Sequence, residues 1–174
     1  VLIDLAARAD AAGDRVTRGE TCRLLGTVER MEGNLVAARR ELGQAVGVFR
    51  ELDDDVHLAE ALRARGEAEI FGGSLADAEW FLGEAEQLFI TTDNARGRAW
   101  VQQNRAWVSF MSGDHAESRR RLDRAIDEFE RLGDRAGLTW SRGLLAYVYH
   151  FGRRTEEALE LAAVVLDEAR KWDD

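Results

Sequence analysis

The chain has 174 residues, no proline and a formal net charge of −9, and 33% of its residues are charged. A proline-free chain of this kind favours an all-helical domain over a turn-rich β-protein. The negative charge argues against a dedicated nucleic-acid surface, which needs a positive field over the phosphates.

The cysteine content and the hydrophobic pattern indicate a compartment. Cys22 is the single cysteine, so no internal disulfide can form, and a reducing cytoplasm is the default location. No apolar run approaches the roughly 20 residues of a membrane helix. The opening Val-Leu-Ile-Asp-Leu is followed by mixed charge, unlike a signal peptide. We therefore expect a cytoplasmic domain without membrane contact and, since the chain starts at valine, a piece of a longer protein.

A period of 40 residues runs through the whole sequence. Six columns of residues, each spaced by this period, hold their register over four copies without an insertion. The columns are the turn glycines Gly33, Gly73 and Gly113, with Gly152 one place early in the last copy; the small residues Gly26, Gly66, Ala106 and Ala146; Ala38, Ala78, Ser118 and Ala158; Leu42, Leu82, Leu122 and Ala162; Ala45, Ala85, Ala125 and Val165; and Phe49, Phe89, Phe129 and Ala169.

Each column has a physical reason. Small residues such as Gly26 and Ala38 let two antiparallel helices cross closely, and the leucine and phenylalanine columns form the apolar face of an amphipathic helix. A glycine such as Gly33 ends the first helix of each pair, in a left-handed conformation. Ser74 with Asp77 and Asp114 with Glu117 resemble capping boxes that start the second helix.

The columns give the elements in chain order. Residues 1–14 are predicted to be the second helix of a truncated repeat, helical over about 2–12, because Leu2 and Leu5 fall in the columns of Leu42 and Ala45. Four full repeats follow at 15–54, 55–94, 95–134 and 135–174. Their predicted helix pairs are 16–31 and 35–52, 56–71 and 75–91, 96–112 and 115–132, and 136–151 and 155–172. The predicted fold class is therefore all-α, a single α-α superhelical solenoid of about nine antiparallel helices over residues 1–174.

These columns resemble the tetratricopeptide repeat (TPR) over essentially the whole chain. The sequence departs from that family in its period, which is longer than the family's 34 residues, and in the missing proline at the end of each repeat. Long copies with an inter-repeat turn like Gly133 to Gly137 look like arrays in multidomain bacterial regulators, including maltose-regulator-like activators and actinobacterial regulatory proteins. The resemblance implies a right-handed superhelix, with first helices lining a concave groove and second helices on the convex side.

The same resemblance assigns candidate binding residues to the concave groove. They are Arg23 in the first full repeat, Arg63 and Glu67 in the second, Trp100, Gln103, Asn104 and Trp107 in the third, and Trp140 and Tyr147 in the fourth. The first half is charged and the second is aromatic. The aromatic residues fit two interpretations: they pack between neighbouring helices, or they form a ligand or peptide site in which Gln103 and Asn104 supply hydrogen bonds.

Three further surfaces stand out. Trp80 is expected to be exposed, as a candidate convex contact, because charged residues occupy its column in the other repeats. Arginine clusters such as 119–121 are expected to lie on a solvated outer face, although an anionic contact stays open. The final helix is apolar on more than one face over residues 161–166, so a following repeat or a partner chain should cover it, and both ends could support self-association.

Catalytic chemistry finds no support in the sequence. The histidines form no metal spacing, Cys22 is expected to be buried, and Gly72-Gly73 is not followed by the residues of a phosphate loop. We therefore expect no catalytic residue, metal or cofactor. The predicted function is a protein- or peptide-binding scaffold within a larger bacterial regulatory or signalling protein. Its partners would be a protein, a peptide or neighbouring domains of the same chain. The alternative is a small-molecule sensor with an aromatic pocket in the groove.

Overall fold

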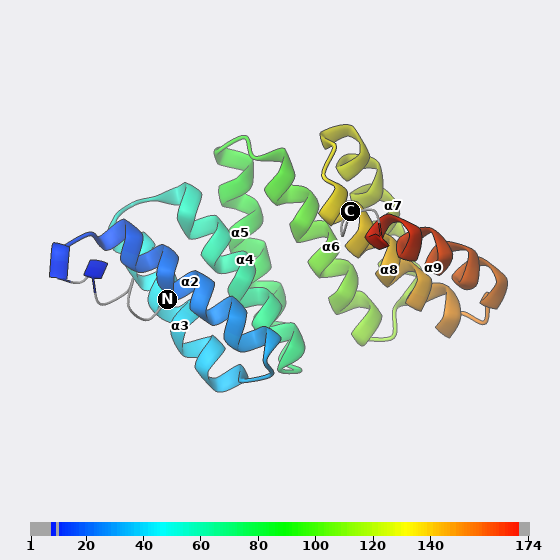
Figure 1. The fold of residues 1–174 in the computed structure, drawn as a ribbon, viewed down its shortest axis with the longest axis horizontal. Helices are drawn as coiled ribbons and strands as arrows, with labels where there is room; N and C mark the ends of the chain where they lie inside the picture. The colour runs from blue at the N-terminus through cyan, green and yellow to red at the C-terminus, as the bar shows by residue number, and fades with distance from the viewer. Residues whose placement is uncertain (1–7, 10, 171–174) are drawn as a thin grey trace. The chain divides into compact units, whose positions relative to one another are not determined.

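The computed structural model describes residues 8, 9 and 11–170, and every regular element in this part of the chain is an α-helix. The helices are α2 (Arg15–Met31), α3 (Leu35–Glu51), α4 (Asp55–Phe71), α5 (Leu75–Thr91), α6 (Ala95–Met111), α7 (His115–Leu132), α8 (Arg135–Phe151) and α9 (Thr155–Arg170) (Figure 1). The all-α fold class predicted from the sequence is confirmed, and the bounds of α2 to α8 lie within one residue of the predicted ones. Most of the helix predicted over about 2–12 lies outside the described residues.

The contacts of the described residues group into two compact units, one ending at Gly97 and one starting at Arg98. In the first unit α2 packs on α3, α4 packs on α5, and α3 and α2 both contact α4. In the second unit α8 packs on α9 and α7 packs on α8. Consecutive helices therefore pair in each unit, as the repeat predicts. A single solenoid over residues 1–174 stays a prediction.

The first helix of every full repeat begins at the same kind of cap. The side chains of Asp14, Asp54, Asn94 and Asp134 each accept a hydrogen bond from the backbone N–H three residues later. This bond satisfies a backbone donor that the helix itself leaves unpaired. The 40-residue spacing of these caps fixes where each repeat starts.

The caps of the second helices are less uniform. Asp114 accepts a hydrogen bond from the backbone N–H of Glu117, as predicted. The capping box predicted at Ser74 and Asp77 is wrong, because Ser74 makes no side-chain cap bond. Its hydroxyl instead accepts a hydrogen bond from the guanidinium of Arg39, at 3.3 Å.

The turn inside each repeat uses one left-handed residue. Gly33, Gly73 and Gly113 have φ of 83°, 78° and 82°, as predicted for glycines that end first helices. In the last copy the glycine lies one place early, yet the left-handed conformation stays in register at Arg153, with φ of 58°. The turn geometry is thus set by the packing of the two helices, and glycine only makes it less costly.

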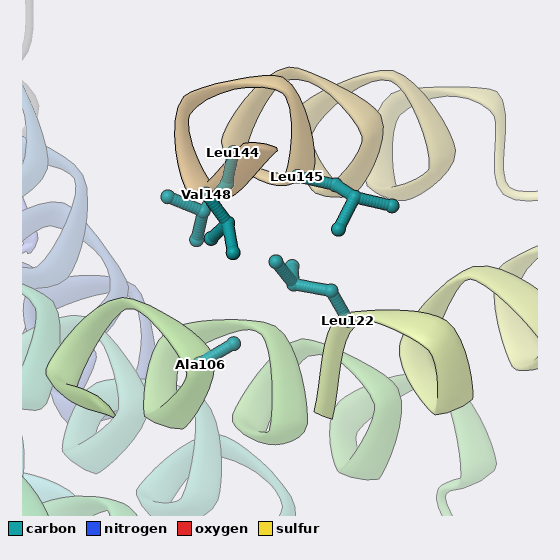
Figure 2. Close-up of a cluster of buried hydrophobic side chains, with 5 residues drawn as sticks. All are labelled: Ala106, Leu122, Leu144, Leu145 and Val148. Atoms are coloured by element: carbon teal, nitrogen blue, oxygen red, sulfur yellow. The ribbon is translucent and has the colours of Figure 1, made fainter. Parts of the chain in front are cut away.

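The core is formed where a first helix closes over the preceding helix pair. Figure 2 shows Leu144, Leu145 and Val148 of α8 pointing toward Ala106 of α6 and Leu122 of α7. The three phenylalanines of the last column are also fully buried, and the ring of Phe129 packs so closely on α8 that a Cβ added at Gly137 would lie 2.4 Å from it. Each second helix therefore needs the next first helix to bury its apolar face.

This packing predicts opposite effects for two glycines of α8. Gly137→Ala should lower the free energy of unfolding by about 1 kcal/mol or more, because its methyl group overlaps the Phe129 ring. Gly143→Ala is the matched control, since nothing lies within 4 Å of its added Cβ. It should raise the free energy of unfolding by about 0.5–1 kcal/mol through helix propensity. Urea denaturation followed by circular dichroism measures both, and equal stability of the two variants would contradict the packing.

The Asp54 cap predicts a pH effect. Burial raises the pKa of Asp54, but hydrogen bonds from the backbone and ring of His57 outweigh it, so the net pKa is lowered. A lowered pKa in the folded state stabilises the fold above the unfolded-state value of about 4, and this contribution disappears as the pH falls through the folded-state pKa. Asp54→Ala should therefore cost about 1 kcal/mol at pH 7 and less below pH 4. Asp54→Asn, which keeps a capping oxygen, should recover most of this loss; an Asp54→Ala deficit that is unchanged at low pH would argue against the ionised cap.

Candidate functional site

The charged half of the predicted groove lies on α2 and α4 in the first unit. Arg23 pairs with Glu20 at 2.9 Å, and Arg63 pairs with both Glu60 and Glu67, each at 3.2 Å. The hydrogen bond to Glu20 raises the pKa of Arg23, and this effect outweighs the opposing effect of burial. The predicted arginines are therefore already paired with carboxylates of their own helices, so a ligand would have to compete with these ion pairs.

Two of the predicted aromatic residues are partly buried and pack against buried residues of the second unit. The indole N–H of Trp100 donates a hydrogen bond to the carboxylate of Asp134 at 3.2 Å, and its ring lies edge-on to Phe129 with centroids 5.1 Å apart. Trp107 lies against the buried cluster of Figure 2 and is 6.2 Å from Phe110 by ring centroids. These two residues make packing contacts, and their role in a ligand site stays a prediction.

The predicted amide donors are also largely covered. Gln103 is 7% exposed and Asn104 is 3% exposed, and the side-chain oxygen of Asn104 has no hydrogen-bond partner. A ligand could reach these groups only if neighbouring side chains moved. Their role as hydrogen-bonding groups of a site stays a prediction.

The other two predicted aromatic residues are exposed on α8. Trp140 is 64% exposed and Tyr147 is 58% exposed, and their spacing of seven residues puts them on one face of the helix. Trp140 occupies the column of Trp100, but the residue equivalent to Asp134 is Asp174, which lies outside the described residues. The structure thus separates the four predicted aromatic residues into a packed pair and an exposed pair.

Tyr147 also lines an open apolar groove between α8 and α9, which we call the α8–α9 groove. The groove has a volume of about 580 Å³. Its lining residues are Gly143, Ala146, Tyr147 and His150 of α8 and Thr155, Ala158, Leu159, Ala162, Val165, Leu166 and Ala169 of α9. Leu159 is 66% exposed and Leu166 is 52% exposed, so the floor and rim present apolar side chains to solvent.

Most of this groove was not among the predicted site residues. The sequence did contain the signal, because Ala162 and Ala169 interrupt the leucine and phenylalanine columns, and residues 161–166 are apolar on more than one helix face. The expectation that this face is left uncovered by its own repeat agrees with the exposure of Val164 and Leu166. The α8–α9 groove, with the exposed Trp140 on the same face of α8 as its lining residue Tyr147, is the strongest candidate binding surface of the described residues.

Two other surfaces were singled out from the sequence. Trp80 on α5 is 60% exposed, as expected, with its ring edge-on to Phe81. Its role as a contact point stays a prediction. In the arginine cluster at the start of α7, Arg120 and Arg121 both pair with Glu117, at 2.7 and 2.8 Å, so neighbouring carboxylates partly neutralise this face.

Residues 8, 9 and 11–170 lack a metal-binding cluster and a membrane-spanning helix. No cluster of three or more histidine, cysteine, aspartate or glutamate side chains there could hold a metal ion. None of the described helices is long and apolar enough to cross a membrane. Cys22 is fully buried, as the sequence predicts.

Comparison with known proteins places the fold. No family model and no curated protein sequence matches the chain. A Rap protein complexed with Competence and Sporulation Factor matches with a TM-score of 0.83 at 15% identity, over 92% of this chain and 45% of that chain. The apo form of RapI gives 0.76 at 16% identity, over 97% and 61%. Kinesin light chain TPR-like repeats from Podosopora anserina give 0.66 at 17% identity, over 99% and 85%.

These likenesses show the fold alone, because every identity is below 20%. The chain has the fold of TPR-like helical repeat proteins, and it spans about half the length of the two Rap structures. The expectation of a tetratricopeptide-type repeat is therefore confirmed at the level of fold.

The division of the tryptophans gives a stability test. Trp100→Ala should lower the free energy of unfolding by about 2–4 kcal/mol, since it removes both the packing on Phe129 and the hydrogen bond to Asp134. Trp140→Ala, in the same column, should change it by no more than about 0.5 kcal/mol. Urea denaturation compares the two variants, and a large loss in Trp140→Ala would mean that this side chain is packed in solution.

Proposed function

We propose that the chain is a protein- or peptide-binding scaffold and that the α8–α9 groove, with Trp140 and Tyr147 beside it, is its binding surface. The proposed setting is a larger cytoplasmic regulatory or signalling protein of bacteria, in which the domain acts by binding. The setting rests on the likeness of the long repeat to arrays in bacterial regulators. The Rap protein complexed with Competence and Sporulation Factor is a further precedent for this fold in recognition.

The observation that carries the proposal is the exposed apolar surface of α8 and α9. Leu159, Leu166 and Tyr147 are each more than half exposed around one groove. Contiguous apolar surface of this kind is costly to keep in water and commonly marks an interaction site. Exposed aromatic residues beside it add anchors that bury a large area with few rotatable bonds.

A displayed library of random 20-residue peptides, selected on the full chain, tests the proposal. Selected peptides should bind with measurable affinity by fluorescence polarisation. Leu159→Glu should weaken binding at least tenfold, because the bound peptide would bury an unpaired carboxylate. Val36→Glu, the same kind of change at an exposed apolar residue of the other unit, is the control and should leave affinity unchanged. Selection of no peptide, or only of peptides insensitive to Leu159→Glu, would refute the proposed function.

A small-molecule sensor is the second candidate function. The volume of the α8–α9 groove lies within the range of 300–1,000 Å³ that is usual for ligand pockets, and Tyr147 and His150 offer polar groups at its edge. A metabolite library screened by thermal shift would favour this candidate if a compound raised Tm in the wild type but not in Leu159→Glu. Equal shifts of Tm in the wild type and in Leu159→Glu would rule out the groove as the sensor site.

A further inference from the structure

The occupant of the α8–α9 groove can be inferred from the interfaces inside each unit. In the second unit, α8 lies on α6 and α7, with Leu144 and Val148 against Ala106 and Leu122 (Figure 2). In the first unit, α4 lies on α2 and α3 in the same way: Ala64 and Ala68 belong to the cluster of Ala38 and Leu42. In both units a helix pair therefore presents an apolar surface that binds one further amphipathic helix.

The α8–α9 groove is this same surface displaced by one repeat. Its residues Ala146, Tyr147, Ala162, Leu166 and Ala169 lie 40 positions after residues of the surface that holds α8. Those residues are Ala106, Trp107, Leu122, Ile126 and Phe129. Continuity with the internal interface thus indicates that the natural occupant is a helix, held through its apolar face.

The groove nevertheless differs from the internal surface at the two largest side chains of that surface that are fully buried. Leu122 and Phe129 are fully buried beneath α8, whereas their counterparts Ala162 and Ala169 are exposed alanines. Phe129 fills the space beside Gly137 so completely that a Cβ at Gly137 would clash with its ring. With alanine at position 169, the space that a phenylalanine ring would occupy is empty. The bound helix must fill this space with its own side chains, because unfilled apolar volume weakens an interface.

The rim of the α8–α9 groove also differs from the rim of the internal interface, because an apolar residue replaces an arginine. Arg119 of the internal interface lies 5.8 Å from the centre of the Tyr149 ring of α8. The counterpart of Arg119 in the groove is Leu159, which is exposed. A helix docked in the groove therefore meets an apolar rim where α8 meets a cation.

We propose that the α8–α9 groove binds an amphipathic helix of a partner protein whose apolar residues are large where the chain's own α6 and α8 carry glycine. The inference rests on the proposed function and specifies its partner. The partner's bulk replaces the missing leucine and phenylalanine, so the groove selects against a helix of the chain's own α8 type.

The test moves side-chain bulk from one side of the interface to the other, either into the bound peptide or into position 169 of the protein. The probes are three fluorescein-labelled peptides of residues 135–151: the unmodified sequence, Gly137→Leu and Gly143→Leu. Gly143→Leu is the control for helix propensity, because an added Cβ at that position of α8 meets nothing within 4 Å. The proteins are the full chain and its Ala169→Phe variant, which restores the phenylalanine column.

The full chain should bind the Gly137→Leu peptide at least fivefold more tightly than either other peptide. Ala169→Phe should reverse the order, so that the unmodified peptide binds more tightly than Gly137→Leu. Circular dichroism should show added helix in the bound peptide. The same preference in both proteins, a preference of the full chain for the unmodified peptide, or no binding of any peptide would overturn the inference.

Other occupants give distinguishable results. The first helix of a following repeat would cover the groove in a longer natural chain, so failure of that longer chain to bind the Gly137→Leu peptide would assign the groove to its own repeat and overturn the inference. Library peptides that need Leu159 but gain no helix on binding would uphold the proposed function and overturn the helix inference. Sedimentation velocity of the chain alone tests a second copy: a dimer dispersed by Leu159→Glu would assign the groove to self-association and overturn it. A monomer under the same conditions leaves the groove open to a partner helix and supports it.

Discussion

The structure depends on one constraint: a helix pair of this repeat cannot bury the apolar face of its second helix alone. Phe129 shows why. Its ring is fully buried because α8, which is capped by Asp134 and carries Gly137, lies directly against it, while Trp100 of α6 packs on it as well. In the first unit His57 of α4 stacks on Phe49 with ring centroids 5.1 Å apart. Each first helix is thus part of the preceding repeat's core as much as of its own.

This constraint explains why the last described helix pair, α8 and α9, has apolar side chains exposed to solvent. At α9 two columns that are fully buried in the earlier repeats are exposed, at Ala162 and Ala169, and both have lost their large side chains. Loss of bulk at Ala162 and Ala169 reduces the apolar surface that must stay in water and leaves room for a different occupant. Positions that depart from the repeat pattern therefore indicate a binding surface, whereas positions that keep the pattern indicate packing between the helices of the chain.

The interfaces also differ in their polar contacts. Glu69 of α4 is 3% exposed and binds Arg39 at 2.6 Å and Arg65 at 2.8 Å. In the second unit the residues equivalent to Arg39 and Glu69 are Arg119 and Tyr149, which meet as a cation and an aromatic ring. A buried carboxylate needs its cations, since it would otherwise lose hydration without compensation. Each of these polar pairs matches a second helix to one particular first helix. The pairs therefore set the order of repeats whose apolar columns are alike.

The sequence by itself determined the described helices, their order and the cap at Asp114, but not the absence of a side-chain cap bond at Ser74. This was possible because a 40-residue period repeats the same local requirements: a capping side chain, an apolar face of period 3.6 and a left-handed residue between helices. Even the displaced Gly152 did not move the turn, since Arg153 adopts the left-handed conformation of its column. The exposure of Trp80 and the burial of Cys22 followed from the same register.

Only the tertiary structure decided which aromatic residues are available. Trp100 and Trp140 share a column and a helix face, and no local rule separates them. Trp100 is held by Phe129 and Asp134, which belong to the next helices of the chain, whereas Trp140 is exposed. The exposure of a residue depends on which other parts of the fold pack on it, so the α8–α9 groove could be identified only from the assembled helices. The sequence showed only that Ala162 and Ala169 replace the larger residues of their columns.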